Sequence, residues 1–214
     1  MSEPRALTPT AYAVLGLLAV QPWTTYELAK QVDQTLSRFW PRTRSKLYEE
    51  PKKLAEAGLA VATPSSTGRR RSTVYAITPA GRQALSDWLG QTSAPPSFES
   101  EHLLKVFYAD NGSTEDLRAT LGQLRDWAHD QSVTNVAVGS RYVAGGGAFP
   151  ERLPTLVLTS RFLDDYLELL DRWASWAEET IADWPADPSA ATADLDALAD
   201  TVQQARDRIE RRAG

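Results

Sequence analysis

Two clusters of basic side chains lie where the local sequence also predicts defined secondary structure. The first belongs to a predicted short helix and consists of Arg42, Arg44 and Lys46, interleaved with Thr43 and Ser45 and followed by Tyr48. The second, Arg69 to Arg71, falls at the predicted tip of a hairpin. Arginine and lysine carry donors suited to guanine edges and phosphates, and threonine and serine hydroxyls bond to either. The row of phosphates along duplex DNA is a counterpart that suits both clusters.

Each cluster also has a simpler interpretation. The helix from Arg42 to Leu54 could be a core helix with a solvated charged face. Residues three and four apart share a helix face, however, so Arg44, Leu47 and Tyr48 cannot all face a core. Basic hairpin tips often only keep a strand edge soluble. The order helix, strand, basic tip, strand is nevertheless that of a winged helix, whose tip arginines approach phosphates or a narrow minor groove.

Residues suited to catalysis or metal binding are sparse. The chain has no cysteine, and its two histidines, His102 and His129, lack the spacing of a ligand pair. The carboxylates fall on helix faces opposite apolar stripes, where solvation is their ordinary role. Gly145 to Gly147 lack the strand, lysine and hydroxyl residue of a phosphate loop, and we interpret them as a hinge. We therefore expect no enzyme, no metal site and no cofactor.

Seven tryptophans allow one further kind of site. Trp127, Trp173, Trp176 and Trp184 fall on apolar faces of the C-terminal half, where core or dimer contacts are the first interpretation. The alternative is an aromatic pocket for a flat apolar ligand. Such an effector would bind between two modules or at a dimer interface, and the sequence assigns no residue to it.

Charge divides the 214-residue chain into two modules. Residues 1–90 contain 12 Lys and Arg against 7 Asp and Glu, whereas the rest contains 11 against 21, so the net charge of −5 conceals a basic half. Gln91 to Ser97, with two adjacent prolines, is the predicted linker between domains at 1–92 and 98–214.

No apolar run approaches the length of about 18 residues that a membrane span needs, and the N-terminus lacks a secretory pattern. We expect a cytoplasmic protein without a membrane partner.

Threonine caps predict three helices of the first module. Thr8 and Thr78 each precede a proline, which is the pattern of a capped helix start. Thr24 and Glu27 form a predicted capping box for the second helix.

The basic third helix is predicted to end at Gly58, and Pro51 inside it should kink the helix or shift its pairing. Strands are expected over 59–62 and 73–77, with a polar tip over 68–72 between them.

Helical periodicity dominates the second module. Helices are predicted over 102–108, after a cap at Ser113, over 156–184 and over 192–210, the last with coiled-coil spacing. Their apolar residues are too numerous for one layer to cover, which predicts a homodimer formed by the C-terminal half.

These patterns resemble the PadR-type transcriptional regulators over about the first 90 residues. The matching segments are Ala13–Leu18, Tyr26–Leu28, Phe39–Pro41, Leu47-Tyr48, Leu54–Leu59 and, most specifically, Tyr75–Gly81. The C-terminal half is similar to the longer subgroup of that family in Leu103–Asp110 and from Arg161 to Trp173.

The resemblance implies a homodimeric winged-helix regulator, usually a repressor, whose C-terminal helices form the dimer. In some members a small phenolic compound relieves repression. The resemblance also implies a phosphate contact at the start of the second helix, where Thr24 and Tyr26 are the candidates. The family often has a His-Gly pair before this tyrosine, whereas this chain has Thr24-Thr25.

We expect a mainly α protein with an N-terminal winged helix-turn-helix, a two-stranded wing and an α-helical C-terminal dimerisation domain. Its expected function is sequence-specific transcriptional regulation, as a dimeric repressor at a palindromic operator in double-stranded DNA, with a small aromatic effector as a further option. The alternative is a winged-helix module that binds proteins and not DNA. A module of that kind would not need so many cations over 42–46 and 69–71.

Overall fold

The computed structural model describes residues 7–37, 39–40, 44–67 and 70–213. For residues 44–46, 66–67, 70–71 and 213 it describes the backbone alone. The chain divides into two compact units, Met1–Pro96 (unit 1) and Ser97–Gly214 (unit 2). Each unit has a buried apolar core of its own.

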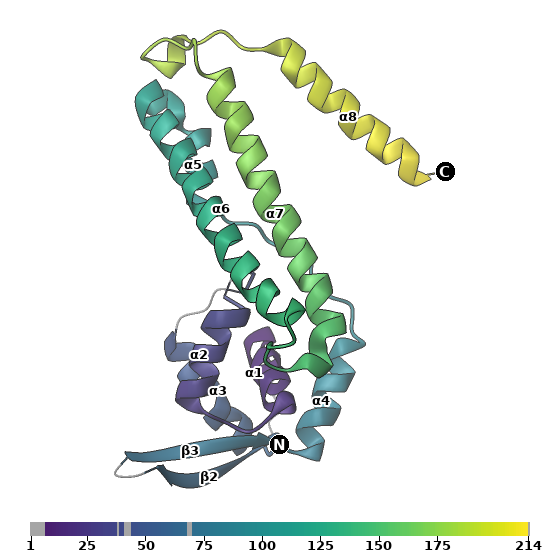
Figure 1. Ribbon diagram of the computed structural model, residues 1–214. Helices are drawn as coiled ribbons and strands as arrows, with labels where there is room; N and C mark the ends of the chain where they lie inside the picture. Colours follow the sequence, from purple (N-terminus) through teal and green to yellow (C-terminus); the bar gives the residue numbers. More distant parts are fainter. Residues whose placement is uncertain (1–6, 38, 41–43, 68–69, 214) are drawn as a thin grey trace, which may run out of the picture. The chain divides into compact units, whose positions relative to one another are not determined.

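The described chain is mainly helical, with one small antiparallel sheet in unit 1 (Figure 1). This confirms the expected fold class of a winged helix followed by long C-terminal helices. The elements of unit 1 are α1 (Pro9–Val20), β1 (Trp23–Thr24), α2 (Thr25–Thr35), α3 (Arg44–Glu56), β2 (Ala60–Thr67), β3 (Arg70–Ile77) and α4 (Pro79–Leu89).

The predicted threonine caps are present. The side-chain oxygens of Thr8 and Thr78 accept backbone amides of α1 and α4 at 3.2 and 3.0 Å. At α2, Thr24 Oγ1 accepts the Glu27 amide at 3.2 Å and Glu27 Oε2 accepts the Thr24 amide at 2.8 Å, which completes the capping box. Each cap satisfies amides that the first turn of a helix leaves without intrahelical partners.

Strand β1 was not predicted. The sheet order is β1-β3-β2, and Trp23 and Thr24 pair with Tyr75 and Val74 of β3. Sequence reasoning treated Trp23 and Thr24 only as the start of a helix, because their strand partners lie about fifty positions further along the chain. Strand β1 therefore fixes the start of α2 next to strand β3 at the base of the wing.

Both strands of the wing are longer than predicted. Their register extends from Ala60 opposite Ile77 to Thr67 opposite Arg70. The predicted tip over 68–72 is therefore wrong in extent, because Arg70, Arg71 and Ser72 belong to β3. Serine and threonine are typical turn residues, but here the hydrogen bonds of the paired strands override that preference. Arg69 lies outside the described residues.

The core of unit 1 forms where α1, α2 and α3 meet. Helix α1 has apolar residues all round, which is typical of a helix covered on most sides. The side chains buried most completely include Val14, Leu15, Leu18, Leu28, Leu54 and Pro51. This core fixes α3 from one side.

Unit 2 is built on two long helices that lie side by side (Figure 1). Its elements are α5 (Glu101–Phe107), η1 (Ala109–Asn111), α6 (Thr114–Val143), η2 (Pro150–Arg152), α7 (Leu153–Thr180), η3 (Pro188–Ala190) and α8 (Leu195–Ala213). The predicted cap is present, since Ser113 Oγ accepts the Asp116 amide at 3.1 Å. The apolar stripe of α6 is buried against α7, at Leu117, Leu121, Leu124 and Ala128.

Gly145 to Gly147 form a hydrogen-bonded helix end, whereas the sequence indicated a hinge. Gly145 adopts a φ of 77°, and the Gly146 amide donates to the Arg141 carbonyl at 2.8 Å, as in a Schellman cap. A Cβ on Gly147 would lie 2.0 Å from a ring carbon of Tyr142, so a larger residue there would require the Tyr142 ring to move. Three consecutive glycines suggest flexibility, but the fold favours a glycine at two of these positions for other reasons. Gly145 adopts a positive φ, and Gly147 lies against the Tyr142 ring.

None of the helices in the described ranges combines the length and apolar character needed to cross a bilayer.

Candidate nucleic-acid interface

One face of α3 is anchored in the core of unit 1. Leu47 and Leu54 are 2% and 1% exposed, and Pro51 between them is also buried. These positions lie four and three residues apart, so they form one line along the helix. The helix runs from Arg44 to Glu56 without interruption at Pro51. Burial of the proline ring shows a packing role for a residue that the sequence marked only as a source of strain.

The anchored line determines which side chains α3 presents to solvent. Tyr48 is 44% exposed, and the side chains of Glu49, Lys52, Lys53 and Glu56 are between 57% and 75% exposed. These five residues occupy the part of the helix turned away from the core. Any partner of α3 therefore contacts this side.

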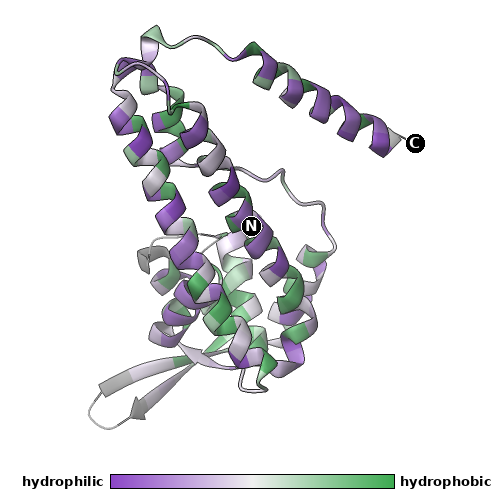
Figure 2. Cartoon of the chain, turned by 45° about the horizontal axis from the view of Figure 1, so that its top comes forward, coloured by the Kyte–Doolittle hydropathy of each residue, from purple (hydrophilic) through white to green (hydrophobic). Residues whose placement is uncertain are grey.

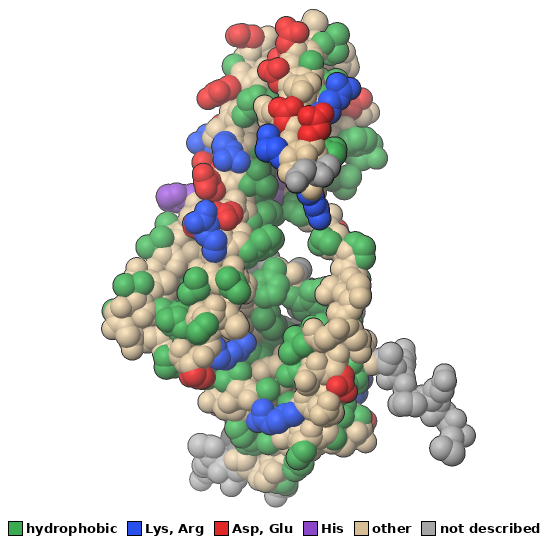
Figure 3. All heavy atoms as spheres, turned by 90° about the vertical axis from the view of Figure 1, so that its right-hand side faces the viewer, with side chains coloured by type: hydrophobic (Ala, Val, Ile, Leu, Met, Phe, Trp, Pro, Cys, Tyr) green, Lys and Arg blue, Asp and Glu red, His purple; other side chains and the backbone are tan. Residues whose placement is uncertain are grey.

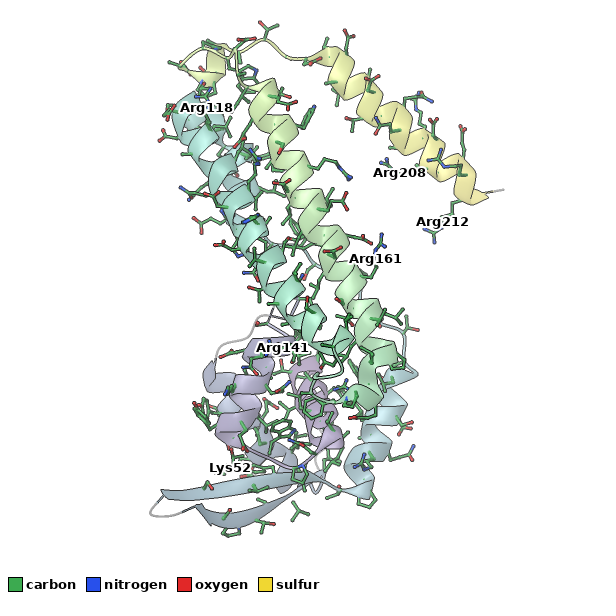
Figure 4. All side chains as sticks on the ribbon, in the orientation of Figure 1. Lys52, Arg118, Arg141, Arg161, Arg208 and Arg212 are labelled. Atoms are coloured by element: carbon green, nitrogen blue, oxygen red, sulfur yellow. The ribbon has the colours of Figure 1, made fainter. Side chains whose placement is uncertain are left out.

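Along the second half of α3, two lysines lie close to three glutamates. Lys53 Nζ lies 3.1 Å from Glu49 Oε2 and 3.5 Å from Glu50 Oε1, and Lys52 Nζ lies 3.8 Å from Glu56 Oε1. The hydrogen bond to Glu49, followed by the charge of Glu50, raises the pKa of Lys53. Lys52, labelled in Figure 4, and Lys53 thus have acidic neighbours on their own helix.

The first turn of α3 differs, because it contains no acidic residue. Its backbone carries Arg44, Ser45 and Lys46, and Arg42 and Thr43 come just before it, outside the described residues. A helix N-terminus also carries a partial positive charge from its free amides. The unbalanced positive charge of α3 is therefore concentrated at its N-terminal end.

The start of α2 places Thr24 and Tyr26 differently. The Thr24 hydroxyl is held by Glu27, accepting its amide and donating to Oε2 at 2.8 Å. Hydrogen bonds from Thr24, first from its backbone, lower the pKa of Glu27. Tyr26 is 64% exposed, so its ring and hydroxyl are accessible. Of the two predicted residues, Tyr26 is the one whose polar group is accessible.

A rigid corner joins α3 to the wing. Gly58 has a φ of 73°, and the Leu59 amide donates to the Leu54 carbonyl at 2.9 Å, which is a Schellman cap. Thr78 Oγ1 donates to the Gly58 carbonyl at 2.8 Å. A Cβ at Gly81 would lie 2.1 Å from the Leu59 carbonyl oxygen, so α4 approaches this corner more closely than any larger residue allows. The wing therefore leaves α3 in a fixed direction.

The described members of the two basic clusters, Arg44 to Lys46 and Arg70 to Arg71, belong to α3 and to the hairpin that follows it (Figure 1). Arg70 and Arg71 stand opposite Thr67 and Ser66 near the outer end of the wing. Among the described residues, no group of three His, Cys, Asp or Glu side chains could hold a metal ion.

Residues 14–87, which contain α3 and the wing, match the model of the transcriptional regulator PadR-like family. These residues thus form a domain of this family. The negative transcriptional regulator PadR of Bacillus subtilis (strain 168) is 30% identical over 99 residues, which are 45% of this chain and 54% of that protein. The chain thus spans about half the length of the curated relatives that it matches. The family that this segment matches is one of transcriptional regulators.

Solved structures show the same fold over most of the chain. Bacillus subtilis PadR in complex with operator DNA has a TM-score of 0.68 at 20% identity, over 82% of this chain and 99% of that one. The complex of PadR with p-coumaric acid has a TM-score of 0.62 at 20% identity, over 81% and 98%. The protein smu.1604c of Streptococcus mutans UA159 has a TM-score of 0.69 at 20% identity, over 83% and 100%. The Vibrio cholerae virulence activator AphA has a TM-score of 0.56 at 25% identity, over 81% and 96%.

The outward position of Glu49 and strand β1 were missed at the sequence level. Reasoning from donors selected the basic residues of α3 and passed over an acidic one. The helical spacing between Leu47 and Glu49 could have identified it, because a buried Leu47 places Glu49 on the opposite face.

Proposed function

We propose that this PadR-like chain represses transcription as a homodimer bound to a palindromic operator in double-stranded DNA. Residues 1–92 bind the DNA and residues 98–214 form the dimer, and chromosomal DNA as partner implies a cytoplasmic protein. The proposed contacts come from α3 and the residues just before it, from the start of α2 and from the wing: Arg42, Thr43, Arg44, Ser45, Lys46, Tyr48, Thr24, Tyr26, Arg69, Arg70 and Arg71.

The uneven charge of α3 carries this proposal. Glutamates accompany the lysines of its second half, whereas its first turn and the residues before it combine Arg42, Arg44 and Lys46 without an acid. The core holds the helix by Leu47, so the basic turn has a fixed place on unit 1. In helix-turn-helix readers, the N-terminal residues of the recognition helix contact base edges.

The relatives support the same partner. Bacillus subtilis PadR is a negative regulator and has been solved with operator DNA, and its sequence is 30% identical to this chain over 99 residues. AphA, which shares the fold, is named an activator, so we take repression from the sequence relative.

Uncovered apolar faces in unit 2 support the homodimer. On α7, Leu158, Phe162, Leu169 and Trp176 are between 49% and 72% exposed. On α8, Leu195, Leu198, Val202 and Ile209 are between 43% and 70% exposed, and hydrophobic and hydrophilic segments alternate along this helix (Figure 2). Hydrophobic side chains reach the surface among the charged ones (Figure 3). Apolar patches of this extent mark interaction surfaces, and a second copy fits a reader of two half-sites.

A small aromatic effector is the least constrained part of the proposal. Trp127 and Trp176 are 43% and 50% exposed, and PadR of Bacillus subtilis has been solved with p-coumaric acid. We propose that a compound of this class binds near tryptophans of unit 2. It would release DNA only if it bound the DNA-incompetent dimer more tightly than the competent one.

The proposal is tested by binding the purified chain to DNA from upstream of its own and neighbouring genes, followed by footprinting. We expect protection of a palindrome whose half-sites lie about one helical turn apart, with two chains per duplex. If the chain is instead a protein-binding winged helix, it should bind none of these fragments more tightly than random DNA. In that case the function proposed here would be wrong even though the fold is correct.

A further inference from the structure

The outward side of α3 has a carboxylate at its centre. Leu47 and Leu54 define the buried line, and Glu49 lies two residues after Leu47, about 200° around the helix at about 100° per residue. Its side chain is 65% exposed. Glu49 therefore points away from the core along the direction in which a DNA-reading helix meets its groove.

We propose that Glu49 is a specificity-determining residue that accepts a hydrogen bond from the N4 amino group of a cytosine in each half-site. This inference rests on the proposed DNA-reading role of α3.

A carboxylate in a groove flanked by phosphates is repelled by them, so its presence there needs a compensating donor. In the major groove, the cytosine amino group is the donor that Glu and Asp side chains accept from. Guanine presents two acceptors at its edge and thymine presents one, so a carboxylate facing them gains no hydrogen bond and is repelled. Adenine presents an amino donor too, but its N7 acceptor lies beside that donor and repels the carboxylate. Glu49 would thus act chiefly by rejecting wrong bases, which is how many specific interfaces discriminate.

Lys53 holds this carboxylate in place. Its ammonium lies 3.1 Å from Glu49 Oε2, one helical turn away, and leaves Oε1 without that contact. An i,i+4 pair on an exposed helix contributes little to stability, but it limits the rotamers of the glutamate. Lys53 is therefore a positioning residue for Glu49 in this proposal.

Glu56 provides a matched control on the same helix. It lies seven residues after Glu49, is 64% exposed, and its Oε1 is 3.8 Å from Lys52 Nζ. Both glutamates have the same charge, a similar exposure and an i−4 or i+4 lysine partner. They differ in position, since Glu49 follows the basic turn and Glu56 is the last residue of α3.

The test selects bound sequences from a randomised duplex pool with the full chain and with its Glu49→Gln, Glu49→Ala and Glu56→Gln variants. We expect the unchanged chain to select one invariant cytosine per half-site that Glu49→Ala no longer selects. Glu49→Gln should shift the preference at that position to adenine, because a glutamine amide can pair with its N6 and N7. The ratio of operator to random-DNA affinity should fall roughly 10- to 100-fold for Glu49→Ala.

The Glu56→Gln variant should select the unchanged motif. If both Glu49 variants selected the motif of the unchanged chain with equal strength, the role of Glu49 would be refuted while the proposed function stood. If removal of either glutamate raised affinity for all sequences alike, the effect would be one of net charge and the inference would also fail. An unchanged chain that selected no motif would refute the proposed function itself.

Discussion

Units 1 and 2 differ in how completely they cover their apolar side chains. In unit 1 the apolar residues of α1, α2 and α3 converge on one core, and the exposed large ones are few in the described part. In unit 2 the facing sides of α6 and α7 are buried, yet α7 has a second apolar side in solvent and the apolar residues of α8 are exposed as well. The difference indicates that unit 1 depends on its core to hold α3, whereas the exposed apolar sides of unit 2 are the surface we propose for the dimer.

The largest effect should come from the core of unit 1. Leu54→Ala removes a side chain that is 1% exposed and should cost about 2–5 kcal/mol of the free energy of unfolding. Leu89→Ala on α4, where the side chain is 70% exposed, should stay within about 0.5 kcal/mol. Urea unfolding of the two variants measures the contrast. Equal midpoints would show that the core of unit 1 does not control its stability.

The next effect concerns the outer side of α7. Replacing Leu169 and Trp176 together by Ser should weaken the dimer by about 2–4 kcal/mol or more, since large apolar residues dominate such interfaces. Arg172→Ser, on the same helix and with a side chain that is 70% exposed, is the control. Sedimentation over a concentration series gives the dimer dissociation constant. A double variant as dimeric as the control would place the dimer contact elsewhere.

The wing should contribute uniformly across DNA sequences. Changing Arg69, Arg70 and Arg71 to Ala should reduce the slope of log affinity against log salt by about 0.9 for each phosphate that the variant no longer neutralises. Lys52→Ala, which removes a lysine that lies 3.8 Å from Glu56, should change the slope less. Fluorescence anisotropy between low and physiological salt provides the slopes. Equal slopes for all variants would exclude the wing from the DNA interface.

The smallest effect concerns the capping box of α2. Thr24→Ala should cost about 1 kcal/mol, and Thr24→Ser should recover most of it. The folded state lowers the pKa of Glu27, so this glutamate stabilises unit 1 at neutral pH. That contribution disappears as the pH falls through the lowered value. Thermal unfolding of the unchanged chain and Glu27→Gln should therefore converge in acid, and a constant difference at every pH would contradict the assignment.

Local features of the sequence predicted most of this fold. The caps at Thr8, Thr24, Thr78 and Ser113 depend on residues at most three positions apart, so the sequence identifies them directly. Strand β1 depends on pairing with Tyr75 and Val74, which no local pattern reveals. The wing was predicted too short for the same reason, because pairing decides the state of residues that favour turns.

The candidate site likewise has residues that the sequence identifies and others that only the fold reveals. Donor chemistry selected Arg44, Lys46 and the wing arginines from the sequence, and α3 and the hairpin are neighbours in the fold. The role of Glu49 needed the burial of Leu47 and Leu54, which sets the orientation of the helix. Residue types in the sequence indicate which side chains are able to bind DNA. The packing of the core determines which of these side chains face the partner.

The central claim is that the first turn of α3 reads the operator, and one comparison of affinities tests it directly. Arg44→Ala combined with Lys46→Ala should lower affinity for the footprinted operator by about 1–3 kcal/mol for each base edge that the variant no longer binds. The melting temperature should be unchanged, and Lys52→Ala on the half of α3 that also carries glutamates should have little effect. A double variant that binds the operator as tightly as the unchanged chain would contradict the account.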